Sequence, residues 1–444
     1  MSKNINYFFL YFIVSALVGL FVRDIPGQPY LLSTISNFMT PDDVTKLGDP
    51  GSFAIGARDV FTHGWIKAEN AWLIRLWPPG FMFLEGMVLK VFGIDAPFIL
   101  VLVLINAACF ALMLSVFRGF LRGVLPEGVA STLPLVPLLF PVTRFFVLQP
   151  GGIILGEGFS IAFFLTFLFL VPVAVRDRSW VSAVFAGLML ALSAYFRSQF
   201  ELIVTFLTLT AIVSFVAYFL VIRRKASEQS QSNFSSALKF VAVAVVVANV
   251  AMAPWRIYSF TDTKNFSWVQ TAQLIYKNAS MTDKELLDVG GGWIVRGGGN
   301  AACRVDPSYC GTSEKEGFYR AFVNNVSDWY AIKLGILDDY WFSDLPAYTS
   351  PAESSSSVND VANFLFLFFV LATFPVLWLA RRSPSFYVYL WQSVSFYACF
   401  FVVFTFAHYE ARYFFAVKIF SVFSFIAIFS LAWKEVLAKR RLSR

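Results

Sequence analysis

Charged residues are scarce in this chain of 444 residues. Lys, Arg, Asp and Glu make up 14% of it, whereas about a quarter of a soluble domain is charged. Hydrophobic residues make up 58% of the sequence, and no water-soluble fold could bury that much apolar surface. The scarcity of charge therefore excludes an ordinary soluble protein and predicts an all-α polytopic membrane protein.

Histidine and cysteine are nearly absent, which restricts the metal sites that the chain could build. Neither His63 nor His408 is near Cys303 and Cys310 in the sequence, which argues against a zinc site of histidine and cysteine ligands. Cys303 and Cys310 stand in a polar loop and are predicted to form a disulfide if that loop faces an oxidising compartment. The alternative for this pair is two free thiols.

Long polar stretches are few, because apolar runs fill most of the chain. Ten runs are candidates for membrane-embedded helices, and a shorter one over 80–93 brings the expectation to about 10–11. The ten runs cover residues 7–22, 98–117, 129–148, 153–175, 180–196, 200–222, 239–255, 358–380, 385–407 and 413–433. The run over 80–93 is short and contains Glu85 and Lys90, so we expect a re-entrant or interfacial helix there.

The basic residues predict the orientation of these helices. They occupy alternate connectors at 118–122, 176–178, 223–225, 381–382 and 439–441. Because Lys and Arg in short loops stay in the cytoplasm, we expect both termini there and the loops 23–97, 149–157, 197–201, 256–357 and 408–412 on the other, outer side. The net charge of +7 is explained by these connectors and is no sign of a nucleic-acid partner.

This topology divides the chain into three parts. We expect an N-terminal transmembrane module over 1–255 with a long first outer loop at 23–97, an outer loop subdomain over 256–357, and C-terminal transmembrane helices with a basic tail over 358–444. The subdomain holds Gly-Gly-Gly at 290–292 and at 297–299. These runs predict turns, since they lack the ending of a phosphate-binding P-loop.

The first outer loop concentrates charge between residues 42 and 63. A solvated face would explain its charged residues, which are Asp42, Asp43, Asp49, Arg58, Asp59 and His63. However, Asp49 stands before residues with the spacing of an amphipathic helix, namely Phe53, Gly56, Ala57 and Val60, so we expect Asp49 to be the N-cap of a helix lying along the membrane. A carboxylate held there could be a general base, with its pKa raised by the apolar boundary.

Cations at the outer ends of three spans are a second signal, because a charge is costly in the membrane unless it is paired or hydrated. They are Arg197, Arg256 and Arg412, and His408 stands close to the last of them. Anchoring at the headgroups would explain any one arginine, but a convergent set matches a lipid phosphate. Glu157, at the outer start of a span, is either a helix N-terminal residue or a functional acid.

The outer loop 256–357 carries candidates for recognition of an acceptor. They are Trp329, Asp338, Asp339, Tyr340 and Trp341. Aromatic rings stack on sugars, but they also anchor loops at lipid headgroups, and the sequence favours neither role.

Several motifs, taken in order, resemble those of one family. Asp49 is followed by Phe53, by Gly64 and by Trp-Pro-Pro-Gly at 77–80, and later come Glu157, Arg-Ser-Gln at 197–199, Ala-Pro-Trp-Arg at 253–256 and His-Tyr-Glu-Ala-Arg-Tyr at 408–413. Over nearly the whole chain this order is similar to the GT-C superfamily of polyprenol-dependent membrane glycosyltransferases. The most similar branch contains protein mannosyltransferases and bacterial aminoarabinose transferases.

The resemblance implies a GT-C-like bundle in the bacterial inner membrane, with an active site on the periplasmic face and both termini in the cytoplasm. It implies an inverting transferase that moves a pentose or hexose, of arabinose or mannose type, from a polyprenyl-phosphate donor. The acceptor would be a hydroxyl of a periplasmic protein such as a pilin, of a glycolipid or of a glycan. Asp49 would activate that hydroxyl, and the donor phosphate would be bound by Arg197, Arg256, Arg412 and His408.

The chain also departs from the family pattern. Pro50 and Phe53 stand where the family often has a second acid and a tyrosine. A second acid, an acceptor contact or a ligand for a divalent cation would then come from Asp42, Asp43, Asp59 or Glu157, and no cofactor is certain. Support for the first loop would come from Arg58, His63, Trp77, Pro78 and Pro79.

Two other classes of function are compatible with the sequence. A flippase or transporter of lipid-linked sugars would place charges in a cavity at mid-membrane, where Arg144 is the one clear cation, and would have no use for a long outer loop. An enzyme of the O-antigen polymerase or ligase type would share the many spans and the large outer loop. It would not need an acid in the first loop, so the Asp49→Asn variant separates it from the GT-C reading.

Overall fold

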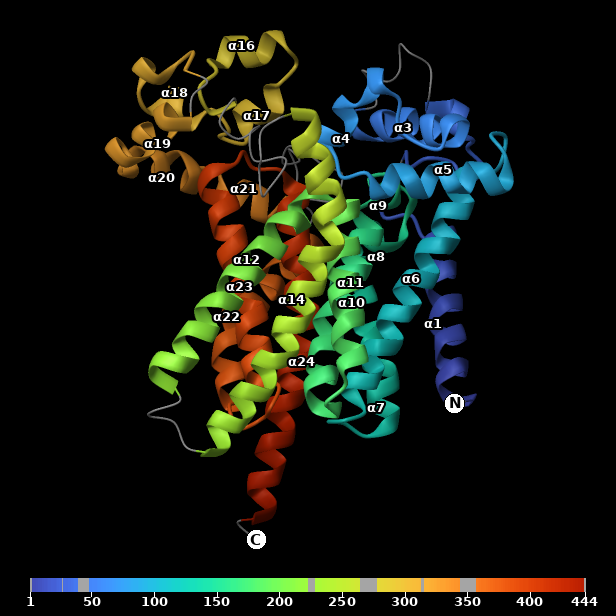
Figure 1. The fold of residues 1–444 in the computed structure, drawn as a ribbon, viewed down its shortest axis with the longest axis vertical. Coiled ribbons are helices and arrows are strands. Elements are labelled where there is room, and N and C mark those ends of the chain that lie inside the picture. Colours follow the sequence, from blue (N-terminus) through green and yellow to red (C-terminus); the bar gives the residue numbers. More distant parts are fainter. Residues whose placement is uncertain are drawn as a thin grey trace.

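The computed structural model describes residues 2–25, 27–38, 48–222, 228–263, 278–312, 315–343 and 357–442. These residues form helices and, within the ranges just given, no strand. Long helices pack side by side in a bundle, and two groups of short helices cover one end of it (Figure 1). We call this end the loop face. The ends of the chain lie at the opposite end of the bundle.

Among the described residues, seven helices are long and apolar enough to cross a membrane. They are α6 (Phe98–Leu121), α10 (Glu157–Asp177), α12 (Ser198–Ala217, continued by a π-helical turn, η4, Tyr218–Ile222), α14 (Glu228–Thr263), α22 (Ser357–Leu379), α23 (Phe386–Phe406) and α24 (Ala411–Leu442). Two helices with shorter apolar stretches, α1 (Ser2–Phe21) and α11 (Trp180–Phe196), pack against α6 and α10. The prediction of an all-α polytopic membrane protein is therefore confirmed.

The predicted span over 129–148 is broken. It consists of α7 (Glu127–Thr132), η3 (Leu133–Leu139) and α8 (Pro141–Leu148), followed by the short α9 (Pro150–Ile153). The chain bends by 91° before α8. Pro141 stands at the break, and proline cannot donate the backbone hydrogen bond that would continue a helix. One of the ten expected spans is therefore a bent pair of helices.

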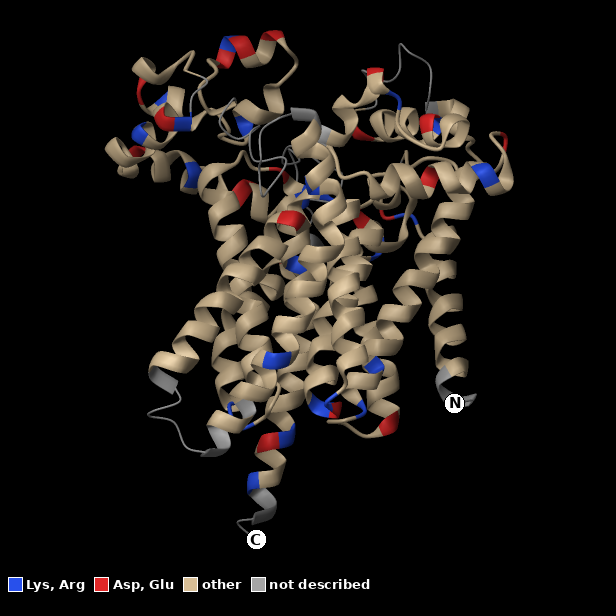
Figure 2. Cartoon of the chain, viewed as in Figure 1, with Lys and Arg blue, Asp and Glu red and all other residues tan. Residues whose placement is uncertain are grey.

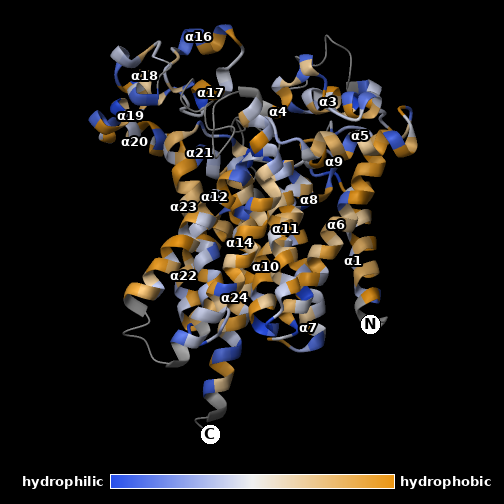
Figure 3. Ribbon diagram, in the orientation of Figure 1, coloured by the Kyte–Doolittle hydropathy of each residue, from blue (hydrophilic) through white to orange (hydrophobic). Residues whose placement is uncertain are grey.

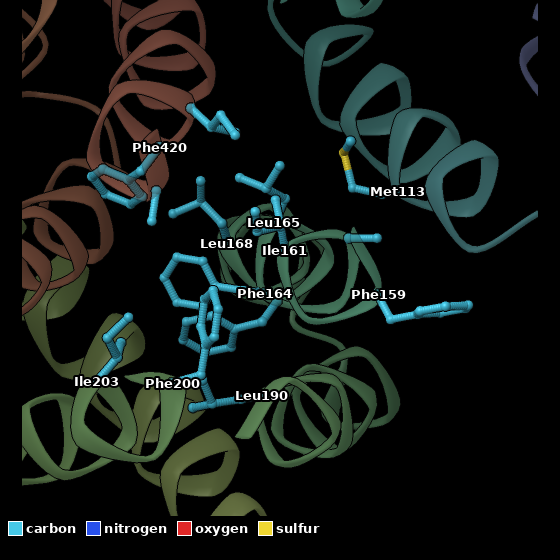
Figure 4. Close-up of a cluster of buried hydrophobic side chains, with 14 of the residues drawn as sticks. Met113, Phe159, Ile161, Phe164, Leu165, Leu168, Leu190, Phe200, Ile203 and Phe420 are labelled. Atoms are coloured by element: carbon cyan, nitrogen blue, oxygen red, sulfur yellow. The ribbon is translucent and has the colours of Figure 1, made fainter. Parts of the chain in front are cut away.

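Helix α10 lies at the centre of the bundle, in contact with α6, α11, α14, α23 and α24. The ring of Phe164 on this helix lies 5.2 Å from the ring of Phe200 on α12 and 6.1 Å from that of Phe420 on α24, measured between centroids (Figure 4). Hydrophobic residues dominate the bundle, and hydrophilic residues gather toward its two ends (Figure 3). This distribution is typical of a protein that exposes its middle to lipid.

The first group of short helices covers the loop face beside α1 and α6. It comprises η1 (Ile35–Phe38), α3 (Asp49–His63), η2 (Ala68–Asn70), α4 (Trp72–Leu76) and α5 (Gly80–Phe92). The predicted apolar face of α3 is buried, as expected, and a Cβ on Gly56 would lie 2.3 Å from the sulfur of Met82 on α5. Helix α5 lies across the loop face, so the run over 80–93 does not cross the bundle (Figure 1).

The second group lies over the other side of the bundle and comes from the predicted outer loop. It comprises α16 (Asp283–Asp288), α17 (Gly292–Arg296), α18 (Ala301–Val305), η6 (Pro307–Tyr309), α19 (Lys315–Asn324), α20 (Val326–Gly335) and α21 (Leu337–Trp341). We call residues 278–312 and 315–343 the loop module. It has a small hydrophobic cluster of its own, and Cys303 and Cys310 form a disulfide within it.

The basic segments that the structure describes are the connectors after α6, α10 and α22 and the tail over 439–441, which is the last part of α24. These four helices end at the face opposite the loop face, where the termini also lie (Figures 1 and 2). All of these basic segments are thus on one side of the bundle, the arrangement on which the prediction of a cytoplasmic side rests.

Candidate active site

Four helices begin close together at the loop face, and each begins with charge. Asp49 is the first residue of α3, Glu157 is the first residue of α10, Arg197 immediately precedes α12, and Arg412 is the second residue of α24. Helix N-termini carry partial positive charge, so their convergence favours bound anions. Together with His408 and Glu410, which precede α24, these four residues form what we call the Asp49 cluster.

Asp49 is shared by two arginines from distant parts of the sequence. Its Oδ2 accepts hydrogen bonds from Nη1 of Arg197 at 3.3 Å and from Nη1 of Arg412 at 3.1 Å. Its Oδ1 has no hydrogen-bond partner among the described residues, and 22% of the side chain is exposed. One carboxylate oxygen is therefore available to a substrate while the other holds the two cations in place.

The N-cap of α3 is Gly48, one residue earlier than the sequence predicted. Gly48 has φ of 59°, a conformation that favours glycine, and Asp49 caps no backbone N–H. The predicted N-cap role of Asp49 is therefore wrong. Because the carboxylate does not bind its own helix, it is left to bind the arginines.

The expected rise in the pKa of Asp49 is also wrong. Burial does raise the pKa, but the charges of Arg412 and Arg197 outweigh burial and hold the pKa of Asp49 below its ordinary value. In the absence of substrate, Asp49 is a stable anion and a weaker base than the sequence suggested.

Each arginine is also held by a second, buried carboxylate. Nη2 of Arg197 lies 2.9 Å from Oε1 of Glu157, and Nε of Arg412 lies 2.5 Å from Oε2 of Glu410. Both glutamates are buried, and Gln199 donates a hydrogen bond of 2.9 Å to Glu157. The two guanidinium groups would therefore stay in position if their hydrogen bonds to Asp49 were broken.

Glu410 connects the arginine to the histidine. Nε2 of His408 lies 2.7 Å from Oε1 of Glu410, and the hydroxyl of Tyr413 donates to the same oxygen at 2.8 Å. Burial raises the pKa of Glu410, but Arg412 and His408 outweigh burial and hold that pKa well below the usual range. Three carboxylates therefore face two guanidinium groups in the cluster.

Arg256 lies outside the Asp49 cluster. It is inside α14, where its Nε lies 3.8 Å from Oε1 of Glu201 on α12 and its Nη1 donates to Asn249 at 2.9 Å. The predicted convergence therefore holds for Arg197, Arg412 and His408, and not for Arg256, whose contacts join two helices of the bundle.

The other acids of the first loop do not reach the cluster where the structure describes them. Oδ2 of Asp59 accepts hydrogen bonds from the backbone N–H of Lys67 at 3.0 Å and from the side chain of Asn70 at 2.8 Å, which fixes the turn after α3. Arg58 and His63 are exposed on α3. Asp42 and Asp43 lie outside the described residues.

The Trp-Pro-Pro-Gly motif at 77–80 packs the first loop onto the bundle. The ring of Trp77 lies 6.0 Å from the ring of Phe53, and Pro78 and Pro79 are buried. A Cβ on Gly80 would lie 2.7 Å from the carbonyl oxygen of Tyr195 at the end of α11. The motif therefore sets the height of α3 above the bundle, and with it the position of Asp49.

Two residues predicted to recognise an acceptor are buried. Trp329 is fully enclosed and donates from Nε1 to the carbonyl oxygen of Thr405, and Tyr340 is 1% exposed. For these two the prediction is corrected, because neither ring presents a surface to an acceptor. Trp341 is partly buried with its Nε1 donating to a backbone carbonyl, while Asp338 and Asp339 are exposed on α21.

Glu410, Gln199 and Tyr413 are the members of the site that sequence reasoning missed. All three lie inside motifs already singled out, at 197–199 and 408–413. An acid placed two residues from both a histidine and an arginine was the available signal for Glu410. No group of three or more His, Cys, Asp or Glu among the described residues is placed to hold a metal ion.

Comparisons with known proteins are sparse. No protein-family model matches the chain, and no curated protein is similar to it. Among solved structures, the chain is similar to the archaeal oligosaccharyltransferase AglB of Archaeoglobus fulgidus bound to an inhibitory peptide and a dolichol-phosphate, with 12% identity and a TM-score of 0.48. The oligosaccharyltransferase of the same organism tethered to an acceptor peptide gives 13% identity and a TM-score of 0.49. Each match covers 100% of this chain, which spans about half the length of those proteins, 51% and 50%.

Proposed function

We propose that the Asp49 cluster transfers a sugar from a polyprenyl-phosphate donor to a hydroxyl group of an acceptor, with inversion at the anomeric carbon. The observation that carries this proposal is the Asp49 carboxylate, which is partly exposed and shared by Arg197 and Arg412 where four helices begin. A proton acceptor and a clamp for phosphate then lie side by side at the end of a membrane bundle. Sugar transfer from a lipid phosphate needs these two parts.

The donor phosphate is suited to the cationic side of the cluster. Guanidinium groups bind phosphate oxygens in pairs, and helix N-termini add favourable partial charge. Arg197, Arg412 and His408 would hold the phosphate. A polyprenyl chain could remain in the bilayer, because the cluster lies at the starts of the apolar helices α10, α12 and α24. On this reading Arg256 helps to hold the bundle together.

Binding of the donor would also activate the base. When the phosphate takes the Nη1 groups that now bind Asp49, the carboxylate loses the charges that lower its pKa. Glu157 and Glu410 keep the two guanidinium groups in position meanwhile. Asp49 would thus become a competent proton acceptor only when a donor is present.

The reaction is a single displacement. The acceptor oxygen forms a bond to the anomeric carbon on the face opposite the phosphate, while the bond from that carbon to the phosphate oxygen breaks. The bonding electron pair leaves with the polyprenyl phosphate, and the hydroxyl proton passes to Asp49. A pentose or hexose of arabinose or mannose type would be moved to a periplasmic protein, glycolipid or glycan, at the periplasmic face of a bacterial inner membrane.

The test is transfer of a radiolabelled sugar from synthetic polyprenyl-phosphate donors to cell-envelope acceptors, in membranes with equal amounts of wild type or Asp49→Asn. We expect the variant to lose about a thousandfold in rate, since an asparagine cannot accept the proton. The same assay with and without a chelator of divalent cations decides metal dependence. Equal transfer in both proteins would place the base elsewhere. Absence of transfer in the wild type would favour a flippase of lipid-linked sugars.

A further inference from the structure

Lys333 on α20 is a buried cation that the proposed reaction does not use. It is 1% exposed, and no carboxylate of the described residues lies within ion-pair distance of it. Its ammonium group donates to the carbonyl oxygens of Gly298 at 2.7 Å and Ala407 at 2.6 Å. Burial and the charge of Arg304 lower the pKa of Lys333 to about 7. Two backbone carbonyls from separate segments therefore bind this cation in place of an acid.

Helix α20 covers the C-terminal end of α23. The last carbonyl groups of a helix have no partner within it, and a cation near them is favourable. Trp329 lies one helical turn before Lys333 on α20. Its Nε1 donates to the carbonyl oxygen of Thr405 at 2.7 Å, while Lys333 donates to that of Ala407. The hydroxyl of Tyr330 also lies 3.3 Å from Oγ1 of Thr405, so the loop module binds the end of α23 through three side chains of one helix.

The second Gly-Gly-Gly run of the loop module lies directly on the segment after α23. The backbone N–H of Tyr409 donates to the carbonyl oxygen of Gly297 at 2.7 Å. A Cβ on Gly297 would lie 2.3 Å from the carbonyl oxygen of Tyr409, and a Cβ on Gly299 would lie 2.6 Å from the Cβ of His408. The glycines therefore allow a backbone contact that no other residue would allow.

The segment held in this way is the one that reaches the Asp49 cluster. His408 binds Glu410 at 2.7 Å, Glu410 binds Arg412 at 2.5 Å, and Arg412 binds Asp49 at 3.1 Å. A continuous set of contacts runs from Lys333 through residues 407–410 to the cluster. Loss of the first contact would loosen the segment that carries the others.

We propose that Lys333 is a positioning residue that ties the loop module to residues 407–410 and thereby sets Arg412 against Asp49. Its effect on catalysis rests on the proposed function, whereas its effect on the segment does not. Through these contacts the loop module is connected to Arg412, one of the proposed phosphate-binding residues. The loop module also carries the exposed Asp338 and Asp339. A shift of about 1 Å in a positioning element can cost about a hundredfold in rate.

The experiment uses the full chain in lipid nanodiscs and two readouts. Hydrogen exchange with mass spectrometry follows the peptide over 403–413, and sugar transfer gives kcat and KM. For Lys333→Met we expect exchange at 408–410 to rise about tenfold and kcat to fall about ten- to a hundredfold at equal amounts of folded protein. Lys333→Arg keeps a cationic donor at this position, so this variant should restore a large part of both the slow exchange and kcat. Arg320→Met is the matched control, since Arg320 is exposed and paired with Glu316 within α19.

Each outcome decides the proposal. Faster exchange with lower kcat, rescued by Lys333→Arg and absent in Arg320→Met, supports it. Unchanged exchange overturns it, and so does an unchanged kcat in Lys333→Met when Asp49→Asn is inactive. If the wild type transfers no sugar, the proposed function fails, and the exchange data alone decide whether Lys333 holds the segment. If Lys333→Met does not fold, Lys333→Gln is measured instead, with an intermediate rise in exchange expected.

Discussion

Two aspartates at the loop face bind arginine, and their surroundings differ. Asp24, after α1, is bound through both oxygens by Arg144, from Nε at 3.1 Å and from Nη2 at 2.6 Å. The remaining nitrogen of Arg144 donates to two backbone carbonyls, and Gln149 donates to Asp24 as well. Asp49 instead offers one oxygen to two arginines at 3.1 and 3.3 Å, and its other oxygen has no partner in the described part of the chain.

The comparison teaches that an arginine beside a carboxylate is not in itself a sign of function. The Asp24–Arg144 pair is bidentate and saturated, which suits a structural tie between the end of α1 and the bend before α8. The Asp49 cluster keeps unused bonding capacity at a partly exposed position, which suits a site that exchanges partners with a substrate. Saturation of the polar atoms separates the two cases.

The largest expected effect is on catalysis. Asp49→Asn should reduce sugar transfer about a thousandfold per folded molecule, whereas Asp24→Asn should leave that rate within about twofold, because Asp49 is the proposed proton acceptor and Asp24 is not. Both variants are measured in the transfer assay after correction for folded protein. A comparable loss of transfer in Asp24→Asn would contradict the distinction between a structural Asp24 and a functional Asp49.

The second effect is on the free energy of unfolding, where we expect Asp24→Asn to be the more damaging of the two variants. Asp24→Asn leaves the charge of Arg144 without its anion and should cost about 2–3 kcal/mol, the usual value of charged hydrogen bonds, since the pair is partly buried. Asp49→Asn should cost about 1 kcal/mol or less, because Glu157 and Glu410 still neutralise the arginines. Thermal unfolding of the two purified variants measures the difference. Equal losses would show that the Asp49 contacts are as structural as those of Asp24.

The smallest expected effect is on the pH profile. The lowered pKa of Asp49 means that its ion pairs are complete above the ordinary aspartate value of about 4 and are lost only as the pH falls further. We therefore expect no fall in kcat/KM caused by Asp49 between pH 7 and 5. In Arg412→Gln the pKa rises, so the acid limb of the residual activity should move to higher pH. An unmoved limb in that variant would argue against electrostatic control by Arg412.

Much of the cluster was predictable because Glu157, Arg197 and Arg412 stand at the ends of apolar runs and Asp49 stands at the start of the amphipathic helix predicted in the first outer loop. The alternation of basic connectors predicts one common side of the membrane for Asp49, Glu157, Arg197 and Arg412, and the structure brings these four residues together. Arg256 was misassigned because its apolar run ends at 255 while α14 continues to Thr263, so that the arginine lies inside the helix. Apolar runs locate helices well and helix ends poorly.

Other features depend on contacts between distant segments, which no local pattern reveals. Trp329 looks like a binding residue in the sequence, and it is buried because it bonds to Thr405, 76 residues away. The pKa of Asp49 was predicted in the wrong direction because burial could be guessed from the apolar surroundings, whereas the approach of two arginines could not. The sequence analysis therefore located these residues but could not identify the groups with which they form hydrogen bonds and ion pairs.

The most direct test of the account is binding of polyprenyl phosphate to the full chain in lipid nanodiscs, compared between wild type, Arg412→Gln and Arg144→Gln. Loss of a charge-assisted contact should weaken binding about tenfold or more in Arg412→Gln, while Arg144→Gln, judged on folded protein, should bind within about twofold of the wild type. Equal binding by wild type and Arg412→Gln, or equal loss in both variants, would contradict the claim that the unsaturated cluster is the phosphate site.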